Sequence, residues 1–243
     1  MHFQHLTSAA RKSLSLAALA MLTACGGGGG SDDPAPVNTA DLNPSLTSAT
    51  LPAALPNATK LVAAAFTSTS GSYTTTVGSA TYTYNLSGSD IVTLTGSTLA
   101  NYNSLDRGFL MLCNKSTPSN AAAVIASPYL ISATPAKPEE LVGKSFETVD
   151  GCAYDESVPP LNYNSDGTVT ATNGVTTATV FTKAEFAKYV SDIGLKDGND
   201  VYRGHIYKLT YLNGLATDTA YVIIETFREN NQDGIAMYVQ IPD

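Results

Sequence analysis

Residues 219–241 read TAYVIIETFRENNQDGIAMYVQI, and this stretch decides the fold class. Two runs rich in Val, Ile, Thr and Tyr flank Asn231-Gln232-Asp233-Gly234, whose composition is typical of a hairpin turn closed by a glycine with positive φ. From Ile235 to Ile241 every second residue is apolar, and this period of two places one face of a strand in a core. The stretch therefore predicts two antiparallel strands joined by a tight turn.

The same pattern extends upstream to Lys60. Tyr82, Tyr84 and Leu86 alternate with polar residues, and Asn164-Ser165-Asp166-Gly167 is a second predicted turn. Further candidate strands span residues 61–67, 73–78, 91–95, 108–112, 123–126, 145–149, 167–172, 176–181, 201–212 and 219–228. We therefore expect a mainly β fold, with an antiparallel sheet, a barrel or a sandwich as the alternatives.

One helix is predicted among these strands. Thr182 and Glu185 have the spacing of a capping box, in which each side chain satisfies a free backbone amide of the first turn. Apolar residues follow at helical spacing from Phe186 to Ile193, and Gly194 is a typical C-terminal stop. The pattern predicts a helix over about 183–193 that packs its apolar stripe on the sheet.

The first 24 residues have a different composition. Arg11 and Lys12 form a positive region, and Ser13–Met21 forms an apolar core of nine residues. This core is too short to span a bilayer, which requires about 20 residues. Residues 1–24 are therefore interpreted as an export signal.

The signal ends in Leu22-Thr23-Ala24-Cys25, which resembles the lipobox of bacterial lipoprotein precursors. The resemblance implies that the chain is cut before Cys25, that its thiol takes a diacylglycerol and that the new amine is acylated. Because Gly26 is not an aspartate, it also implies the outer membrane, with the protein facing the periplasm or the cell surface. The membrane is then a partner through the lipid anchor, which several acyl chains make effectively permanent.

Residues 25–59 predict a flexible tether. Five glycines are followed by a Pro-, Ala-, Thr- and Asn-rich run in which prolines interrupt any continuous helix. The alternative is that Leu51 and Leu55 pack on the folded part of the chain. The globular domain is expected over residues 60–243.

Three prolines between residues 128 and 140 could divide this domain into two lobes. Cys113 and Cys152 lie on opposite sides of that stretch. With Cys25 acylated in an oxidising envelope, each is the only partner for the other, which predicts a disulfide. A bridge closing a loop of about 40 residues contributes roughly 3–4 kcal/mol and favours one cooperative unit.

Leu141-Val142-Gly143-Lys144-Ser145-Phe146 resembles the opening strand of small calycin-like barrels. That family usually carries a tryptophan where this chain has Phe146. The resemblance implies a barrel topology.

Composition excludes several classes of site. The formal net charge of −8 becomes −10 when residues 1–24, with Arg11 and Lys12, are removed. His205 is then the only histidine, and the chain has no tryptophan. These features exclude a His-cluster metal site, a cysteine-rich zinc module and a basic nucleic-acid surface. We expect no cofactor, no metal and no nucleic-acid partner.

The sequence contains only weak matches to the residue patterns of catalytic sites. His205 lies in a candidate strand without a G-x-S-x-G nucleophile motif anywhere in the chain. Asp155/Glu156 and Glu139/Glu140 are the densest acidic pairs, but neighbouring acids in a loop point in divergent directions. We interpret them as solvated loop charge and do not expect an enzyme. An unrecognised hydrolase is the least favoured alternative.

Two loops have oxygen-bearing residues at alternating or adjacent positions. Residues 229–234 place Glu, Asn and Asp before a glycine, and residues 197–200 read DGND. A calcium loop of the EF-hand type requires a glutamate at its twelfth position, where this chain has Gln240. We interpret both segments as turns.

Thirteen tyrosines are the most unusual feature of the composition. Tyr82, Tyr84, Tyr207, Tyr211 and Tyr221 are candidates to line a pocket for a small amphipathic ligand, and the alternative is that they fill the core. The favoured function is a lipid-anchored envelope protein that acts as a binding or accessory module for a small ligand or a partner protein. The alternative is a structural or adhesive surface lipoprotein.

Overall fold

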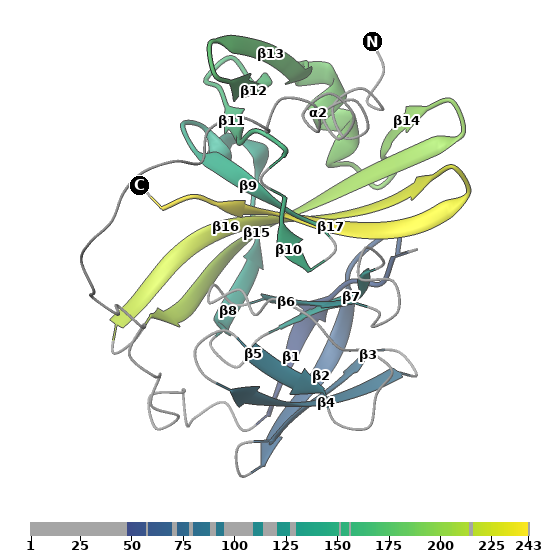
Figure 1. The fold of residues 1–243 in the computed structure, drawn as a ribbon, viewed down its shortest axis with the longest axis vertical. Helices are drawn as coiled ribbons and strands as arrows, with labels where there is room; N and C mark the ends of the chain where they lie inside the picture. The colour runs from purple at the N-terminus through teal and green to yellow at the C-terminus, as the bar shows by residue number, and fades with distance from the viewer. Residues whose placement is uncertain are drawn as a thin grey trace, which may run out of the picture.

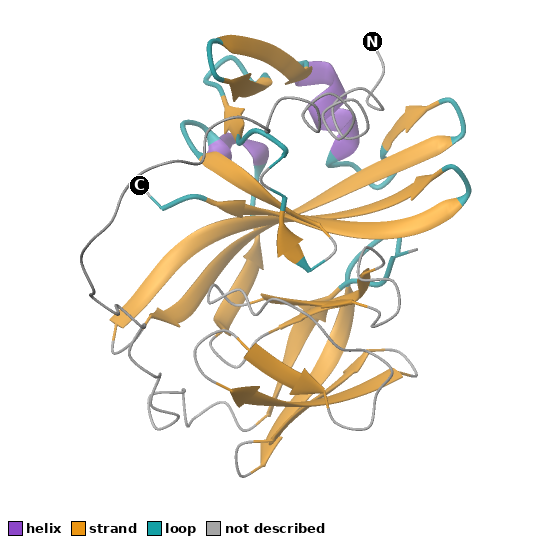
Figure 2. Ribbon diagram, in the orientation of Figure 1, coloured by secondary structure: helices purple, strands orange, loops and turns teal. Residues whose placement is uncertain are grey.

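The computed structural model describes residues 48–56, 58–69, 72–77, 80–87, 91–94, 109–113, 121–126, 130–150, 152–155, 157–213 and 216–242. The protein is mainly β, as the alternating pattern predicts. Its strands form one large sheet and two smaller ones, and the smaller sheets lie together on one side of the large sheet (Figure 1). The helices lie on the other side of the large sheet (Figure 2).

The large sheet contains ten antiparallel strands in the order β13-β12-β11-β9-β17-β16-β15-β14, with β10 paired to β9 and β8 paired to β15. Their bounds are β8 Leu130–Pro135, β9 Ser145–Asp150, β10 Ala153–Tyr154, β11 Leu161–Tyr163, β12 Val169–Asn173, β13 Thr176–Phe181, β14 Leu195–Asp197, β15 Asp200–Asn213, β16 Ala216–Glu229 and β17 Gln232–Gln240. The predicted hairpin over residues 219–241 is confirmed as β16 and β17.

The large sheet is open. Among the described strands, β13 and β14 end the sheet and do not pair with each other. The barrel alternative, and with it the calycin-like topology, is therefore wrong, and the arrangement is sandwich-like. Ser145 and Phe146 of the calycin-like stretch lie in β9, an interior strand paired with β17 on one side and with β10 and β11 on the other.

The smaller sheets come from the first part of the described chain. Their strands are β1 Ser48–Ala53, β2 Val62–Thr69, β3 Ser72–Val77, β4 Ala80–Ser87 and β5 Ile91–Leu94, paired in that order, and β6 Phe109–Cys113 with β7 Ala121–Ala126. A bridge between Ala54 and Val124 joins the end of β1 to β7.

β1 lies within the predicted tether of residues 25–59, so the folded part begins earlier than the predicted boundary at residue 60. Prolines do block a helix here, but β1 is an edge strand, where a missing amide donor such as that of Pro52 is tolerated. Ala53 and Ala54 are fully buried, and Leu55 packs against the core. Of the two residues in the alternative that Leu51 and Leu55 pack on the folded part, Leu55 does so, and the side chain of Leu51 lies outside the description.

The first core lies between the large sheet and the smaller strands. Ala64, Met111 and Val124 enter it from the smaller strands, and Ile224 and Met237 enter it from the large sheet, all without exposed surface. This core is continuous across the proline-containing stretch between residues 128 and 140.

The predicted disulfide between Cys113 and Cys152 is confirmed. It joins the end of β6 to the turn between β9 and β10, and both cysteines belong to the first core. The disulfide therefore ties the smaller strands to the large sheet covalently.

The second core covers the opposite face of the large sheet, because successive side chains of a strand point to opposite faces. Ile206 of β15 and Ile223 of β16 are buried there under the 3₁₀ helix η2 (Pro138–Leu141) and helix α2 (Lys183–Tyr189). A chain of aromatic ring contacts runs through it from Phe146 to Tyr163, Phe186, Phe181 and Tyr189.

Helix α2 begins as predicted and ends earlier. Thr182 Oγ1 accepts a hydrogen bond from the Glu185 amide at 3.3 Å, and the Glu185 carboxylate accepts one from the Thr182 amide at 2.9 Å. The helix stops at Tyr189, four residues before the predicted end, and both the amide and Oγ of Ser191 donate to the Lys188 carbonyl just beyond it. Ile193 is 73% exposed and lies outside the apolar stripe.

The two predicted turns have different outcomes. Gly167 has a positive φ of 85° and closes the Asn164–Gly167 turn, as predicted. In the β16–β17 hairpin the positive φ angles belong to Asn230 and Asn231, so the predicted role of Gly234 is wrong. Gly234 lies inside β17, where a Cβ atom would overlap the ring of Phe227.

Candidate functional site

A groove with a volume of about 190 Å³ opens beside α2, between this helix, the region of η2 and the β11–β12 turn. The buried rings of Tyr163 and Phe186 form its innermost lining. Val142 and Ala187 are exposed apolar contributors. Lys183 supplies a cation, and the exposed Glu139 supplies an acid. The groove therefore combines an apolar base with a charged margin, which suits a small amphipathic molecule.

The β11–β12 turn is held by its own hydrogen bonds. The Gly167 amide donates to the Asn164 carbonyl at 3.0 Å, and Asp166 accepts hydrogen bonds from the Thr168 amide at 2.9 Å and hydroxyl at 2.7 Å. These bonds lower the pKa of the Asp166 carboxyl. The stem of Lys183 lies over Gly167, where a Cβ atom would come within 3.0 Å of it.

The opposite wall of the groove is anchored by η2. Leu141 is fully buried, and Glu140 accepts hydrogen bonds from the Lys137 amide at 2.9 Å and from the Tyr221 hydroxyl at 3.2 Å. The Lys137 bond is the main reason that the pKa of Glu140 is lowered. Lys144 Nζ lies 5.2 Å from the centre of the Tyr221 ring. Both walls are thus fixed to the sheet before any ligand arrives.

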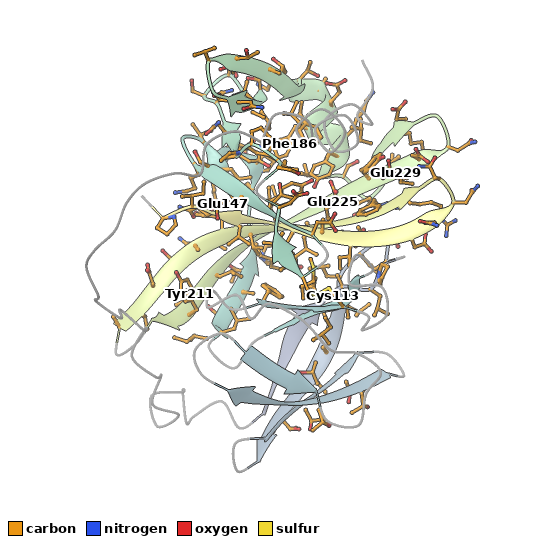
Figure 3. All side chains as sticks on the ribbon, in the orientation of Figure 1. Cys113, Glu147, Phe186, Tyr211, Glu225 and Glu229 are labelled. Atoms are coloured by element: carbon orange, nitrogen blue, oxygen red, sulfur yellow. A yellow bond between two sulfur atoms is a disulfide. The ribbon has the colours of Figure 1, made fainter. Side chains whose placement is uncertain are left out.

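Glu225 is a buried acid on the α2 side of the large sheet. It lies in β16 and is only 7% exposed. Figure 3 shows Glu225 and Phe186 on one side of the sheet, with Cys113 and Tyr211 on the other. Tyr238 donates its hydroxyl to Glu225 Oε1 at 3.3 Å. The Tyr189 hydroxyl also faces Glu225 but makes no hydrogen bond of good geometry with a described residue.

Burial raises the pKa of Glu225 to about 7. The tyrosine hydroxyls around it oppose that effect, and the negative charges of Asp150 and Glu229 add to it. Burial, with the charge of Glu225, also raises the pKa of Tyr163, Tyr189 and Tyr238 far above its ordinary value. The three hydroxyls therefore stay protonated and can act only as neutral donors or acceptors.

Helix α2 connects Glu225 with the groove. Phe186 lines the groove, and its ring centre lies 5.1 Å from that of Tyr163 and 5.9 Å from that of Tyr189. Tyr189, one turn further along the helix, reaches Glu225. A movement of α2 would change the groove and the surroundings of Glu225 together.

The predicted ligand-lining tyrosines do not meet at one place. Tyr207 and Tyr211 face the first core, and the Tyr207 ring contacts Phe109 at 6.5 Å. Tyr221 lies on the opposite face of the large sheet, so these three cannot line one pocket. Tyr82 and Tyr84 belong to β4, but their side chains lie outside the described part of the structure.

The other sequence candidates have structural roles or lie outside the description. Cys25 and Glu156 are outside the described residues. Asp155 accepts hydrogen bonds from Ser157 in a turn. Burial lowers the pKa of His205, whose Nε2 is buried without a hydrogen-bond partner among the described residues.

The segments considered for calcium are turns in the structure. Arg228 pairs with Asp233 at 2.7 Å across the β16–β17 hairpin, and Asp200 accepts a hydrogen bond from the Asn230 amide. Within the described ranges, no group of three or more His, Cys, Asp and Glu residues is placed to hold a metal ion.

Comparison of the chain with known protein families, with characterised proteins and with solved structures finds no match. In the described part of the chain, no helix is long and apolar enough to cross a membrane.

The sequence did not predict that the groove and Glu225 both lie against helix α2. One signal was present, since Glu225 follows directly on the apolar and aromatic run YVII. An acid that follows Tyr221 and Ile223 at a spacing of two lies on their face, and that face proves to be buried.

Proposed function

We propose that the protein is a lipid-anchored envelope protein that binds a small amphipathic ligand in the groove beside α2. The observation that carries the proposal is the groove itself, with Tyr163 and Phe186 at its base and Lys183 at its margin. Its volume of about 190 Å³ lies below the roughly 300–1,000 Å³ typical of drug-sized ligands, which favours a small molecule.

The chemistry of the lining suggests how the ligand binds. Its apolar part packs against the rings of Tyr163 and Phe186 and against Val142, while its polar part reaches the ammonium group of Lys183 and the polar groups of the β11–β12 turn. Because both walls are held by hydrogen bonds within the protein, little ordering is required on binding.

Two variants of α2 test the groove. Ala187 lines it and Ala184 does not, although both are exposed on the same helix. Ala187→Trp fills the groove with a large ring, whereas Ala184→Trp adds the same ring outside it. We expect small molecules extracted from protein purified out of its own envelope to be lost with Ala187→Trp and retained with Ala184→Trp. Equal recovery from both variants would contradict the groove as the binding site.

The lipid anchor is proposed from Leu22-Thr23-Ala24-Cys25 and is tested separately. Cys25→Ser removes the thiol that takes the diacylglycerol. We expect this variant to lose metabolic labelling by fatty acid and to leave the membrane fraction in the absence of detergent. Unchanged labelling would contradict acylation at Cys25.

A structural or adhesive role is the second candidate, and the sheet edge formed by β13 favours it. Residues 176–179 are exposed, and no charged residue occurs between Gly167 and Phe181 to discourage pairing with another strand. If this edge binds a partner strand, Thr177→Lys should abolish the assembly, whereas Thr172→Lys on the neighbouring strand β12 should leave it intact. Assembly that survives Thr177→Lys would remove this candidate.

A further inference from the structure

Among the described residues, the charges that shift the pKa of Glu225 are those of two acids, Asp150 and Glu229. The titratable groups that interact electrostatically with it are Asp150 of β9, Tyr163 of β11, Tyr189 of α2, Tyr202 of β15, Tyr238 of β17 and Glu229 of its own strand. All are acidic or neutral. A buried carboxylate without a cation is strongly disfavoured unless hydrogen bonds replace the lost water.

The residues that flank Glu225 in the sheet are small. Gly204 of β15 and Ala236 of β17 are its direct partners in the ladder. The ring of Tyr189 fills the space over Gly204, where a Cβ atom would overlap it. The last residue of α2 therefore closes the space above the Glu225 carboxyl.

The same region contains hydroxyls with unused hydrogen-bonding capacity. Tyr189 Oη and Thr148 Oγ1 are buried and have no hydrogen-bond partner among the described residues. Thr148 is the ladder partner of Tyr238, the residue that donates to Glu225. A cluster with spare donors can stabilise a carboxylate only after some rearrangement brings those donors to it.

We propose that the protonation state of Glu225 controls whether helix α2 stays packed on the sheet, an arrangement that we call the latch. In its neutral form the carboxyl fits the closed cluster, and Tyr189 holds α2 on the sheet. When the proton leaves to solvent, the carboxylate requires water that the closed cluster excludes, and α2 shifts from its seat to admit it.

Helix α2 is the element that moves, because the strands around Glu225 are held more strongly. β15, β16 and β17 are joined by continuous antiparallel ladders on both sides of Glu225. In contrast, α2 is a seven-residue helix, and helices this short depend on packing for their stability. Since burial raises the pKa of Glu225 to about 7, the latch would operate near neutral pH.

This inference goes beyond ligand binding, because it concerns the seat of α2 in the unliganded protein. It adds a consequence for the groove, since Phe186 of α2 is part of the groove lining. The latch can therefore be tested with no ligand present, and its failure would leave the proposed function standing.

The chain has no tryptophan, so a single one provides an unambiguous reporter of α2. In the full-length protein carrying Ala184→Trp, we expect the fluorescence to change in one step between pH 5 and pH 9, with a midpoint near 7. Glu225→Gln in this background should abolish the step, because the amide cannot ionise. Glu147→Gln, a change of the same type at an exposed position of β9, should leave the step unchanged.

Two outcomes would overturn the proposal. One is a fluorescence change that persists in Glu225→Gln, which would assign it to another group such as His205. The other is the absence of any change in the Ala184→Trp protein over this pH range.

Hydrogen exchange provides a test that does not depend on the folding of a variant. After correction for the intrinsic pH dependence of exchange, amides of residues 186–190 in the unmodified protein should lose protection between pH 6 and pH 8 by at least about tenfold. Amides in the β15–β16 ladder should keep theirs. Equal protection of residues 186–190 at the two pH values would contradict the latch.

Discussion

The ring of Tyr189 lies over Gly204, at the position of β15 that pairs with Glu225. One contact thus joins the end of α2, the middle of the large sheet and the buried acid. A glycine is required at residue 204 because any Cβ atom would enter the space of the ring. The seat of α2 therefore depends on the absence of a side chain at one position in a strand.

Gly204→Ala is expected to destabilise the protein by about 1–3 kcal/mol, because overpacking forces Tyr189 from its position. A double-mutant cycle with Tyr189→Ala separates this contact from strand propensity. In the Tyr189→Ala background, Gly204→Ala should lower the free energy of unfolding only slightly. Urea denaturation measures the effect of Gly204→Ala in both backgrounds. A cost that is the same in both backgrounds would show that the Tyr189 contact is not responsible.

The stability of the protein is expected to fall as the pH rises through the titration of Glu225. Its folded pKa of about 7 is above its ordinary value of 4.5, so the fold favours the protonated form. The resulting stability is fully present below pH 4.5 and is lost by pH 7, a change of roughly 3 kcal/mol at 1.36 kcal/mol for each pKa unit.

Urea denaturation of the unmodified protein and of Glu225→Gln at several pH values checks this prediction. The lowered pKa of His205 acts in the opposite direction, because burial favours its neutral form and stability is lost as the pH falls. Both proteins keep His205, so the difference between their stabilities isolates Glu225. A difference that does not vary between pH 4.5 and pH 7 would argue against a raised pKa.

The disulfide is expected to leave no free thiol in the folded domain. Unreduced, denatured protein should react with no alkylating reagent at Cys113 or Cys152, as peptide mass analysis would show. Replacing both cysteines with serine should cost about 3–4 kcal/mol, chiefly because the unfolded chain loses its restraint. Alkylation of both cysteines without reduction would contradict the bridge.

The helix cap offers a smaller, local prediction. Thr182→Ala removes the hydroxyl that accepts a bond from the Glu185 amide and should destabilise the protein by about 1 kcal/mol. Thr179→Ala, at an exposed strand position, is the matched control. Equal losses of stability in thermal denaturation would mean that the cap contributes nothing specific.

Much of the fold was predictable because its signals are local. The alternation after Ile235 and the Thr182–Glu185 spacing report interactions between neighbouring residues, and both predictions are confirmed. The sequence left barrel and sandwich open as alternatives, because closure of a sheet depends on which distant strands meet. Strand β1 was missed because Pro52 argues against a helix but is compatible with an edge strand.

The candidate site was harder to predict for the same reason. Tyr207 and Tyr221 both lie in long strands with similar composition. The register of β15 against β16 nevertheless places their side chains on opposite faces of the sheet. Glu225 and Tyr189 meet only because α2 folds back over Gly204. No spacing along the chain encodes that meeting.

Ligand binding in the groove beside α2, by a protein anchored through lipid, can be tested in one experiment. The most direct measurement is the native mass of the protein extracted from its own envelope in mild detergent. We expect a chain that begins at an acylated Cys25, with one added small molecule that is lost in Ala187→Trp and retained in Ala184→Trp. A mass that corresponds to the acylated chain alone in all three proteins would contradict the binding function.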